Sequence, residues 1–321
     1  MSSTLSQNSP ETEWDDLQNR TLLYCVGAQK AGTSWLHSYF GKHPEIHVPA
    51  CKELHYFDNL MGPEKGNVHK QRQTQLTRKR PAGFLGTSKT KMKFPSREYS
   101  QALIDMHECE QGDHSSYKKV LCDGMDDQNV VADITPSYSV LGAPELEVML
   151  NVSPNTRFLY ILRDPIERMW SSLRMIFVAR KKAHSKFPND FPDPSLYEMA
   201  HKLVHKGAHK RIVRRSDYAR YLTALVDVVP QERRHIVFYE ELFSQDVLDQ
   251  ISGFLGVSPL TADLKTRVRE GDDFSLPDDI RHELRNLLRP QYQYVSDMFG
   301  DRVPKTWDMK ALDSKSNGAV G

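Results

Sequence analysis

An eight-residue loop with two glycines, residues 27–34, constrains the fold of this chain more than any other segment. It follows the apolar run 22–26, which is typical of a buried strand, and precedes residues 35–40, which are typical of a helix start. A glycine-rich turn in that position directs backbone N–H groups and the positive end of the helix at an anion. The sequence therefore predicts a phosphate cradle where a strand passes into a helix.

The loop nearly matches the nucleotide-binding pattern G-x-x-x-x-G-K-[ST] and then departs from it. Gly27 and Gly32 have the required spacing, but Thr33 follows the second glycine where that pattern has a lysine. The lysine lies inside the loop, at Lys30, where it can approach a 5′-phosphate and the group that leaves from it. Taken alone, the loop also allows a second interpretation, a glycine-rich turn that merely ends a strand.

A second boundary between a strand and a helix lies further along the chain. Arg163, Asp164 and Pro165 follow the apolar run 157–162. Asp164 suits the N-cap position of a helix, and Pro165 suits its first residue. Apolar residues then recur on one helix face, and Ser171 follows Arg163 by eight residues. Taken alone, this segment also fits an arginine that pairs with Asp164 and a serine on a solvated face.

The two segments together, GAQKAGTSWL at 27–36 and RFLYILRDPIERMWSSL at 157–173, resemble the nucleotide-binding segments of sulfotransferases. Those enzymes use 3′-phosphoadenosine 5′-phosphosulfate (PAPS), and the pattern is most similar to the heparan- and carbohydrate-type branch and its bacterial relatives. The resemblance covers roughly residues 20–307, with weak stretches at 60–125 and 180–212. It extends to KELHYFD (52–58), VVADITPSY (130–138), RRSDYARYL (214–222), HIVFYEEL (235–242) and LLRPQYQYVSDMFG (287–300).

The resemblance implies a P-loop-like three-layer α/β fold and a binding site for PAPS as co-substrate. In the family, Lys30 would neutralise charge on the leaving phosphate, Thr33 and Ser34 would hold the 5′-phosphate, and Arg163 with Ser171 would bind the 3′-phosphate. The donor-binding residues predicted in this way are Gln29, Lys30, Ala31, Gly32, Thr33, Ser34, Trp35, Arg163 and Ser171.

The resemblance also supplies a candidate general base. Glu53 aligns with the glutamate that serves as base in the carbohydrate branch, and a partly desolvated carboxylate can take the proton of an acceptor. His55 is the rival base, because the phenol and steroid branch uses a histidine. The ordinary interpretations are a surface salt bridge between Glu53 and Lys52, and a structural role for His55 beside Tyr56 and Phe57, which we expect in a second strand.

Three further positions bear on specificity. Asp133 matches the acidic position of the family pattern E-x-[ST]-P-x-Y, where it would orient an acceptor or cap a turn. Ile134 replaces a lysine of the heparan-type enzymes, which counts against a glycosaminoglycan acceptor but not against sulfuryl transfer. Ser216 stands where many relatives have glycine, so the nearby contact with the nucleotide is expected to differ.

The alternation of apolar runs and helical stretches predicts a parallel sheet with helices on both faces. We expect a disordered tail at 1–20, one domain at 21–307 with an insertion or lid at 60–125 near the acceptor site, and a frayed tail at 308–321. The expected strands are 21–26, 129–133, 157–162 and 235–239, and the expected helices are 34–42, 144–150, 166–180, 196–212, 217–228, 244–255 and 279–299.

The charge is distributed unevenly, although the formal net charge is only +1. Residues 61–100 hold ten Lys and Arg against two Asp and Glu, and residues 180–215 hold ten against three. Solvated loops and helix faces are the ordinary interpretation. The functional interpretation is an electropositive mouth that steers the anionic donor and an anionic acceptor. We do not expect a nucleic-acid partner, because neither segment shows interleaved aromatics or a known binding motif.

Histidines recur at His201, His205 and His209, which fall on one face of the helix expected at 196–212. Two histidines spaced i, i+4 can share a zinc ion. No glutamate follows the first histidine as in H-E-x-x-H, and no third ligand is apparent. We therefore expect no metal, and a basic helix face over the acceptor cleft.

Composition and cysteine use point to a cytoplasmic protein. No stretch approaches the ~20 apolar residues that span a bilayer, and the polar start of the chain does not match a signal peptide. The cysteines at positions 25, 51, 109 and 122 are scattered, which suits reduced thiols, and pairing of Cys109 with Cys122 would need an oxidising compartment.

Two other functional classes remain open at this stage. The first is an ATP-dependent P-loop kinase or NTPase, which a requirement for Mg²⁺ would reveal. The second is a non-catalytic nucleotide-binding protein, which would show no turnover. The sequence names neither the acceptor, which can be a carbohydrate, a lipid or a small molecule, nor the oligomeric state.

Overall fold

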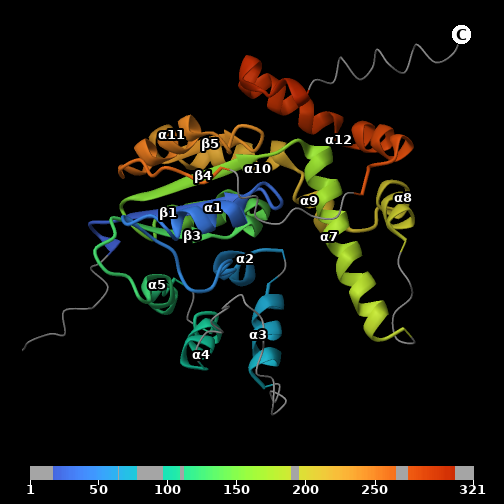
Figure 1. The fold of residues 1–321 in the computed structure, drawn as a ribbon. Coiled ribbons are helices and arrows are strands. Elements are labelled where there is room, and N and C mark those ends of the chain that lie inside the picture. The colour runs from blue at the N-terminus through green and yellow to red at the C-terminus, as the bar shows by residue number, and fades with distance from the viewer. Residues whose placement is uncertain are drawn as a thin grey trace, which may run out of the picture.

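Five short runs of the chain lie side by side as a parallel sheet in the order β2-β3-β1-β4-β5 (Figure 1). A computed structural model describes residues 17–63, 65–77, 97–108, 112–188, 195–264 and 274–307. The strands are β1 (Thr21–Gly27), β2 (Ile46–His47), β3 (Val130–Ile134), β4 (Thr156–Leu162) and β5 (Arg234–Phe238). The predicted α/β fold with a central parallel sheet is thus confirmed.

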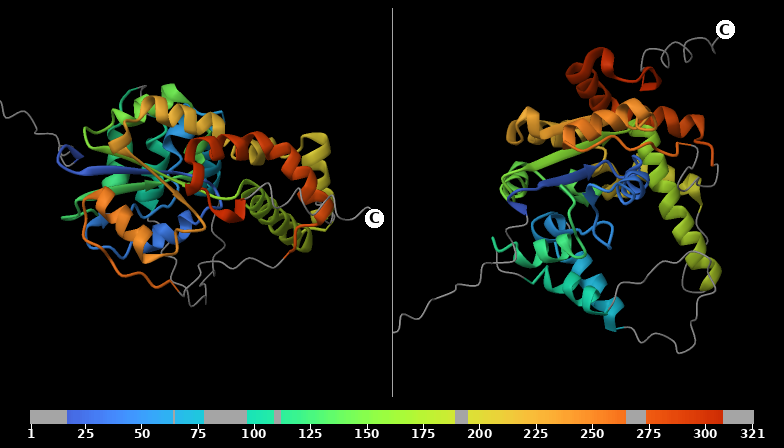
Figure 2. Two further views of the ribbon diagram at one scale, coloured as in Figure 1. Left: turned by 90° about the horizontal axis from the view of Figure 1, so that it is seen from above. Right: turned by 60° about the vertical axis from the view of Figure 1, so that its left-hand side comes forward.

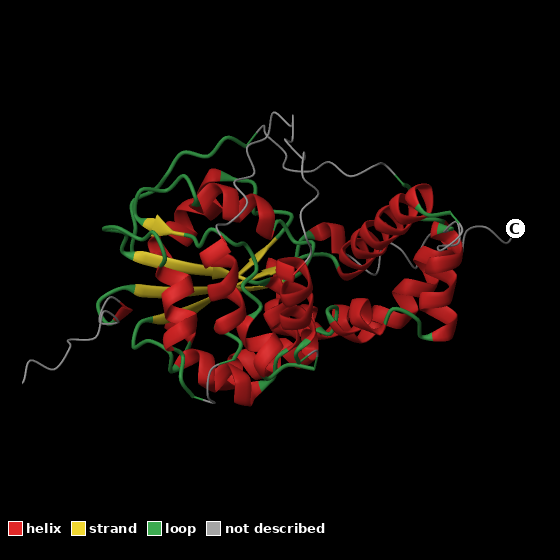
Figure 3. Ribbon diagram, turned by 90° about the horizontal axis from the view of Figure 1, so that it is seen from below, coloured by secondary structure: helices red, strands yellow, loops and turns green. Residues whose placement is uncertain are grey.

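The inner residues of β1 and β4 are apolar because helices cover both faces of the sheet (Figure 3). Residues 22–26 of β1 and 158–162 of β4 are all buried and belong to one continuous core. The four expected strands lie where they were predicted, to within about a residue at each end. The edge strand β2 was not predicted, because two residues carry no periodic pattern.

The helices that the sequence predicted flank this sheet. Asp164 caps α7 by accepting a hydrogen bond from the Glu167 amide at 3.0 Å, and Pro165 is its first residue, as expected. The observed bounds are α1 (Thr33–Phe40), α6 (Ala143–Leu150), α7 (Pro165–Lys186), α10 (Tyr218–Val228), α11 (Gln245–Leu255) and α12 (Asp278–Phe299), with short 3₁₀ turns η2 (Pro136–Val140), η3 (Gln231–Arg233), η4 (Gly300–Arg302) and η5 (Lys305–Trp307).

One expected helix is divided in two, which corrects the prediction for 196–212. Helix α8 (Leu196–Lys206) ends at Gly207, whose φ of 57° is a left-handed conformation that suits glycine after a helix. His209 follows with a φ of 56° and precedes α9 (Lys210–Arg214). The predicted ladder of three histidines is therefore wrong: His201 and His205 remain neighbours, with ring centroids 4.2 Å apart, but His209 lies outside their helix.

Four helices occupy the segment between β2 and β3, where the sequence showed no clear period. Together they lie at the β3 side of the sheet (Figure 1). They are short, and their pattern is interrupted by loops, so local periodicity could not reveal them. Their bounds are α2 (Tyr56–Leu60), α3 (Asn67–Thr77), α4 (Arg97–Asp105) and α5 (Ser115–Cys122). Whether they act as a lid stays a prediction.

Leu17, which was expected in a disordered tail, is part of the folded domain. It is buried, and its carbonyl accepts a hydrogen bond from the Ser153 hydroxyl at 2.9 Å. The described residues do not include 1–16, Cys109 or 308–321, so the predictions for these residues stay predictions. Of the described cysteines, Cys25 and Cys51 are free thiols.

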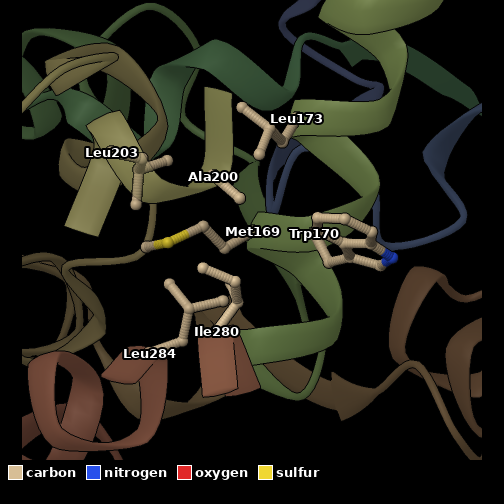
Figure 4. A pocket seen from close by; sticks show the side chains of 7 residues that line it. All are labelled: Met169, Trp170, Leu173, Ala200, Leu203, Ile280 and Leu284. Carbon is tan, nitrogen blue, oxygen red and sulfur yellow. The ribbon is translucent and has the colours of Figure 1, made fainter. Parts of the chain in front are cut away.

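Helix α7 is held against α8 and α12 by apolar side chains that meet between the three helices (Figure 4). These side chains leave no room for water between them. Beyond this packed half, α7 extends past the sheet on the same side as α3 (Figures 1 and 2). The packed residues are Met169, Trp170, Leu173, Ala200, Leu203, Ile280 and Leu284. Of the helices in the described ranges, none has both the length and the apolar character needed to cross a bilayer.

Candidate active site

The glycine-rich loop runs from the end of β1 into α1 at the carboxyl edge of the sheet. Gly32 precedes α1 with a φ of 80°, and a Cβ there would lie 2.8 Å from Leu242 Cδ2, so only glycine fits. The first intrahelical bonds run from the amides of residues 35 and 36 to the Gly32 carbonyl. The amides of Thr33 and Ser34 precede those bonds and are oriented toward the helix start, as an anion site requires.

Lys30 lies inside this loop with a left-handed φ of 73°. Its Nζ is 4.0 Å from the sulfur of Met175, on the extended half of α7. Its carbonyl oxygen accepts a hydrogen bond of 2.6 Å from Arg163 Nη1. The loop, the end of β4 and α7 therefore meet at Lys30.

Arg163 follows β4 and turns toward the loop rather than toward its neighbour Asp164. Its guanidinium lies over the ring of Tyr239, 4.4 Å from the centroid, and it donates to the Lys30 carbonyl. Asp164 instead caps α7 and accepts a hydrogen bond from Tyr292 at 2.9 Å. Burial raises the pKa of Asp164 to about 6. The alternative in which Arg163 pairs with Asp164 is thus not what the structure contains.

Arg215 is a cation of this site that sequence reasoning did not single out. It lies in the turn after α9, donates to Gln29 Oε1 at 3.1 Å and donates to Ser137 Oγ at 3.1 Å. The neighbouring Ser216 points away, into the core, where its hydroxyl accepts a hydrogen bond of 3.0 Å from the buried Arg168. The only available signal was the stretch RRSDYARYL, whose second arginine precedes Ser216.

The other predicted donor residues take distinct positions. Ala31 and Thr33 are buried residues of the loop itself. Ser171 is half-buried on α7, one helical turn before Met175. Trp35 is buried on α1, stacked on Tyr39 with centroids 5.5 Å apart and edge-on to Phe243. These residues surround the loop from α1 and α7.

Glu53 lies in the segment that connects β2 to α2, between Lys52 and His55. Glu53 and His55 both have left-handed φ angles, of 64° and 54°. Lys52 Nζ is 2.5 Å from Glu53 Oε1, and His55 Nε2 is 3.4 Å from Glu53 Oε2. The other ring nitrogen of His55 lies 2.8 Å from the Asp58 carboxylate. His55 is therefore bracketed by two carboxylates.

Tyr56 and Phe57, expected in a strand, begin α2 instead. Both rings are buried, and they pack edge to face with centroids 4.8 Å apart. The left-handed backbone of His55 turns the chain into this helix, so the expected strand cannot continue. The prediction of a second strand at this point is wrong.

The charges around His55 set the protonation of this cluster. Burial raises the pKa of Glu53, but the hydrogen bond from His55 and the charge of Lys52 outweigh it and hold that pKa at about 2. Burial lowers the pKa of His55, but Asp58 and Glu53 outweigh it and hold that pKa at about 9. At neutral pH Glu53 is a carboxylate and His55 an imidazolium, so only Glu53 is ready to accept a proton.

This cluster lies close to β1 and α1. Burial lowers the pKa of His37 on α1, the charge of Lys52 lowers it further, and the charge of Glu53 opposes that shift. Burial likewise raises the pKa of the Cys25 thiol in β1 to about 12, against the charge of Lys52. The Glu53 segment follows β2, and both β2 and β1 are parallel to β3, so this segment and the glycine-rich loop start from the same carboxyl edge of the sheet.

Asp133, by contrast, is closed off from any ligand. It is fully buried, and its carboxylate accepts hydrogen bonds from the hydroxyls of Tyr117 at 2.9 Å, Thr135 at 2.6 Å and Tyr138 at 2.8 Å. Burial raises its pKa above the ordinary value. Asp133 therefore braces the turn after β3, and it does not touch an acceptor.

Among the described residues, no group of three or more His, Cys, Asp or Glu side chains is arranged to hold a metal ion. His201 and His205 on α8 are exposed, and their neighbours on that helix are Lys202 and Lys206. At the carboxyl edge of the sheet, the described residues bring together the cations Lys30, Arg163 and Arg215, and the segment after β2 adds the Glu53 carboxylate.

Comparisons with known proteins bear on the family and on the fold. A model of the Sulfotransferase family matches residues 23–261. A solved sulfotransferase from Alicyclobacillus acidocaldarius is 21% identical, with a TM-score of 0.59, over 90% of this chain and 98% of that one. The sulfotransferase domain of the curacin biosynthetic pathway is 18% identical, with a TM-score of 0.47, over 93% and 97% of the two chains.

The sulfotransferase domain of the Synechococcus PCC 7002 olefin synthase is 17% identical, with a TM-score of 0.46, over 90% of this chain and 98% of that one. A search of curated proteins found no match. The family model, which matches most of the chain, shows the family, and the likeness to the Alicyclobacillus acidocaldarius structure supports the fold alone.

Proposed function

Because this chain belongs to the sulfotransferase family, we propose that it transfers a sulfuryl group from PAPS to a hydroxyl or amine of an acceptor. The observation that carries the proposal is the hydrogen bond from Arg163 to the Lys30 carbonyl, which joins the loop after β1 to the end of β4. The segment that carries Glu53 follows β2, which is parallel to the other strands, and the hydrogen bond from His55 and the charge of Lys52 hold the pKa of Glu53 at about 2. Sulfuryl transfer needs both: cations for the donor and a base for the acceptor.

On the donor side, the residues fit an adenine nucleotide with two phosphate groups. The free amides at the start of α1, together with Thr33 and Ser34, suit the 5′-phosphate. Arg163 and Ser171 suit the 3′-phosphate, and Arg215 adds a further cation through its contact with Gln29. Charge-assisted hydrogen bonds to phosphate are about twice as strong as neutral ones, so these cations would supply most of the affinity.

Lys30 is the proposed electrostatic catalyst. As the bond between sulfur and the bridging oxygen breaks, negative charge grows on the leaving 5′-phosphate. A lysine held inside the loop meets that charge without moving, which stabilises the transition state more than the ground state. Its Nζ lies 4.0 Å from the sulfur of Met175, an exposed residue of α7.

Glu53 is the proposed general base. The acceptor oxygen or nitrogen attacks the sulfur, its new bond to sulfur forms, and its proton passes to Glu53, while 3′,5′-bisphosphoadenosine (PAP) leaves. A carboxylate with a pKa of about 2 is a weak base. It suffices because the proton becomes strongly acidic as the acceptor bonds to sulfur. His55 then acts as a positioning residue that holds Glu53 ionised.

No described residue favours the ATP-dependent alternative. Phosphoryl transfer from ATP requires a Mg²⁺-binding carboxylate at the end of a strand. Asp133, near the end of β3, instead accepts hydrogen bonds from three hydroxyls. Cytoplasmic location rests on the sequence alone and is proposed on that basis.

The decisive experiment is a transfer assay with labelled PAPS and pools of carbohydrate, lipid and small-molecule acceptors. We expect a product that is heavier than its acceptor by one sulfuryl group, formed without added Mg²⁺. Transfer of phosphate from ATP instead, or the absence of any PAP release with every pool, would contradict the proposal.

A further inference from the structure

The extended half of α7 presents one continuous face that begins at the candidate active site. Ser171, Met175, Val178 and Lys182 follow one another at spacings of four, three and four residues. At about 100° per residue these positions fall within about 60° of one another around the helix axis. We call this set of four residues the α7 stripe.

The inner end of the stripe touches the reacting centre. Met175 Sδ is 4.0 Å from Lys30 Nζ, and Ser171 lies one turn closer to the start of the helix. A molecule bound along the stripe would therefore have one end beside Lys30. The other end would lie where α7 extends past the sheet (Figure 2).

The middle of the stripe is apolar and open. Met175 and Val178 are each 44% exposed. Neither belongs to the set of side chains that packs α7 against α8 and α12. Single exposed apolar residues are ordinary on protein surfaces. Two adjacent ones beside the lysine of a candidate active site form a surface that an apolar part of a ligand would cover.

The outer end of the stripe is cationic. Lys182 and, one turn on, Lys186 are exposed, and no Asp or Glu occurs between Arg168 and Pro188. An anion at this end would therefore meet positive charge, since the only acidic residue of α7, Glu167, lies in its first turn. Seven residues of helix separate Met175 from Lys182, a rise of about 10 Å.

We propose that the acceptor is an amphiphile with a hydroxyl at one end, an apolar chain of about 10 Å, and an anionic group at the other. This inference rests on the proposed function and adds the class of acceptor to it. The hydroxyl would lie at Lys30 and Glu53, the chain along Met175 and Val178, and the anion at Lys182 and Lys186. A carbohydrate acceptor would instead need polar partners along the stripe, and its middle offers none.

Binding provides a test that does not depend on turnover. Laurate, which has the chain and the anion but no hydroxyl to sulfate, is titrated into protein saturated with PAP. We expect binding that weakens about tenfold in the double variant Lys182→Glu/Lys186→Glu, since two attractive surface contacts become repulsive. Lys119→Glu on α5 makes the same change at an exposed lysine far along the chain, and should leave laurate affinity unchanged.

A second variant probes the apolar part. Val178→Asp puts a carboxylate in the middle of the stripe at an exposed helix position, so the fold should persist. We expect at least a roughly tenfold loss of laurate affinity with unchanged PAP affinity. The transfer assay adds a third comparison, in which ω-hydroxylaurate should outperform both its methyl ester and γ-hydroxybutyrate.

The outcomes separate this inference from the function on which it rests. If PAP binds but laurate does not, or if the double lysine variant binds laurate as well as wild type does, the amphiphile is wrong and sulfuryl transfer stands. If sugars are sulfated faster than ω-hydroxylaurate, the acceptor is a carbohydrate and the inference fails. If PAP itself does not bind, the proposed function fails first.

Discussion

Arg72 on α3 donates through Nη2 to the backbone carbonyl oxygen of Glu53, at 3.2 Å. The same guanidinium donates through Nη1 to His107 at 2.9 Å, just beyond α4. Burial lowers the pKa of His107, as does the charge of Arg72, to about 3, so His107 is neutral and accepts this bond. Two helices that the sequence did not predict therefore fix the left-handed backbone of the candidate base.

The first prediction tests this link. Arg72→Lys keeps the charge but cannot make both bonds in the same geometry, and Arg72→Gln also removes the charge. A shift of the base by about 1 Å can cost about a hundredfold in rate, so we expect kcat to fall by about ten- to a hundredfold, more for glutamine than for lysine.

The KM for PAPS should change little, because the hydrogen bonds of Arg72 go to Cys51, Glu53, Leu103 and His107 and not to the glycine-rich loop. Lys70→Gln, at an exposed position on the same helix, is the matched control and should behave as wild type. Equal losses in kcat and in PAP affinity would show that Arg72 supports the whole fold rather than the position of Glu53.

The second prediction concerns the 3′-phosphate. Arg163→Ala should weaken PAP binding at least tenfold, since a charge-assisted contact contributes about 1.5–3 kcal/mol, while the affinity for 5′-AMP should change much less. Calorimetric titration of both nucleotides measures this directly. Arg289→Ala, at an exposed arginine of α12, is the control. Equal affinity of the wild-type protein for PAP and 5′-AMP would remove Arg163 from the site.

The third prediction separates binding from catalysis at Lys30. Lys30→Ala should lower kcat by several orders of magnitude but weaken PAP binding only modestly, because the charge that Lys30 meets grows in the transition state. Single-turnover rates and PAP titration give the two quantities. A proportional fall in both would make Lys30 an anchor for the donor's ground state.

Local signals explain how much of the fold could be predicted. The apolar runs of β1 and β4, the cap at Asp164 and the proline at the start of α7 act within a few residues, so their elements lie where the sequence indicated. Gly207 is an equally local signal, because a glycine with left-handed backbone ends a helix. It ends α8 at this point, whereas the histidine spacing alone predicts one continuous helix.

The candidate site is less predictable because distant residues assemble it. Arg215 and Gln29 are 186 positions apart, and Arg163 and Lys30 are 133 apart. No pattern within a window of sequence encodes such contacts. The resemblance to sulfotransferases named the loop, Arg163 and Glu53, but it did not reveal that Arg72 and His55 hold Glu53 in place. The catalytic roles themselves stay predictions.

The fourth prediction is a pH dependence of stability. The pKa of His55 is about 9 in the fold, above its ordinary 6.5, so its contribution is complete below about pH 6.5 and is lost as the pH rises through 9. The pKa of Glu53 is about 2, below its ordinary 4.5, so its contribution is complete above about pH 4.5 and is lost as the pH falls toward 2.

The cluster should therefore stabilise the fold most between about pH 4.5 and 6.5. Denaturant unfolding of wild type and His55→Asn should differ there by about 1–3 kcal/mol, and the difference should shrink toward pH 9. His282→Asn, an exposed histidine of α12, should show no such dependence. A constant difference at every pH would mean that the His55 charge contributes nothing.

The fifth prediction identifies the base from the pH dependence of the rate. If Glu53 accepts the proton and the His55 imidazolium holds it in place, kcat is level between the two pKa values of about 2 and about 9 and falls above the second. Glu53→Gln, which keeps the shape and removes the basicity, should lower kcat by about 10²–10⁴-fold with PAP affinity retained. If His55 were the base, the rate would do the opposite. It would rise about tenfold per pH unit toward 9, because only the small neutral fraction could act at pH 7.

His55→Asn sharpens the comparison: with Glu53 as base it should leave residual activity and abolish the fall above pH 9. An inactive His55→Asn beside a near wild-type Glu53→Gln would assign the base to His55.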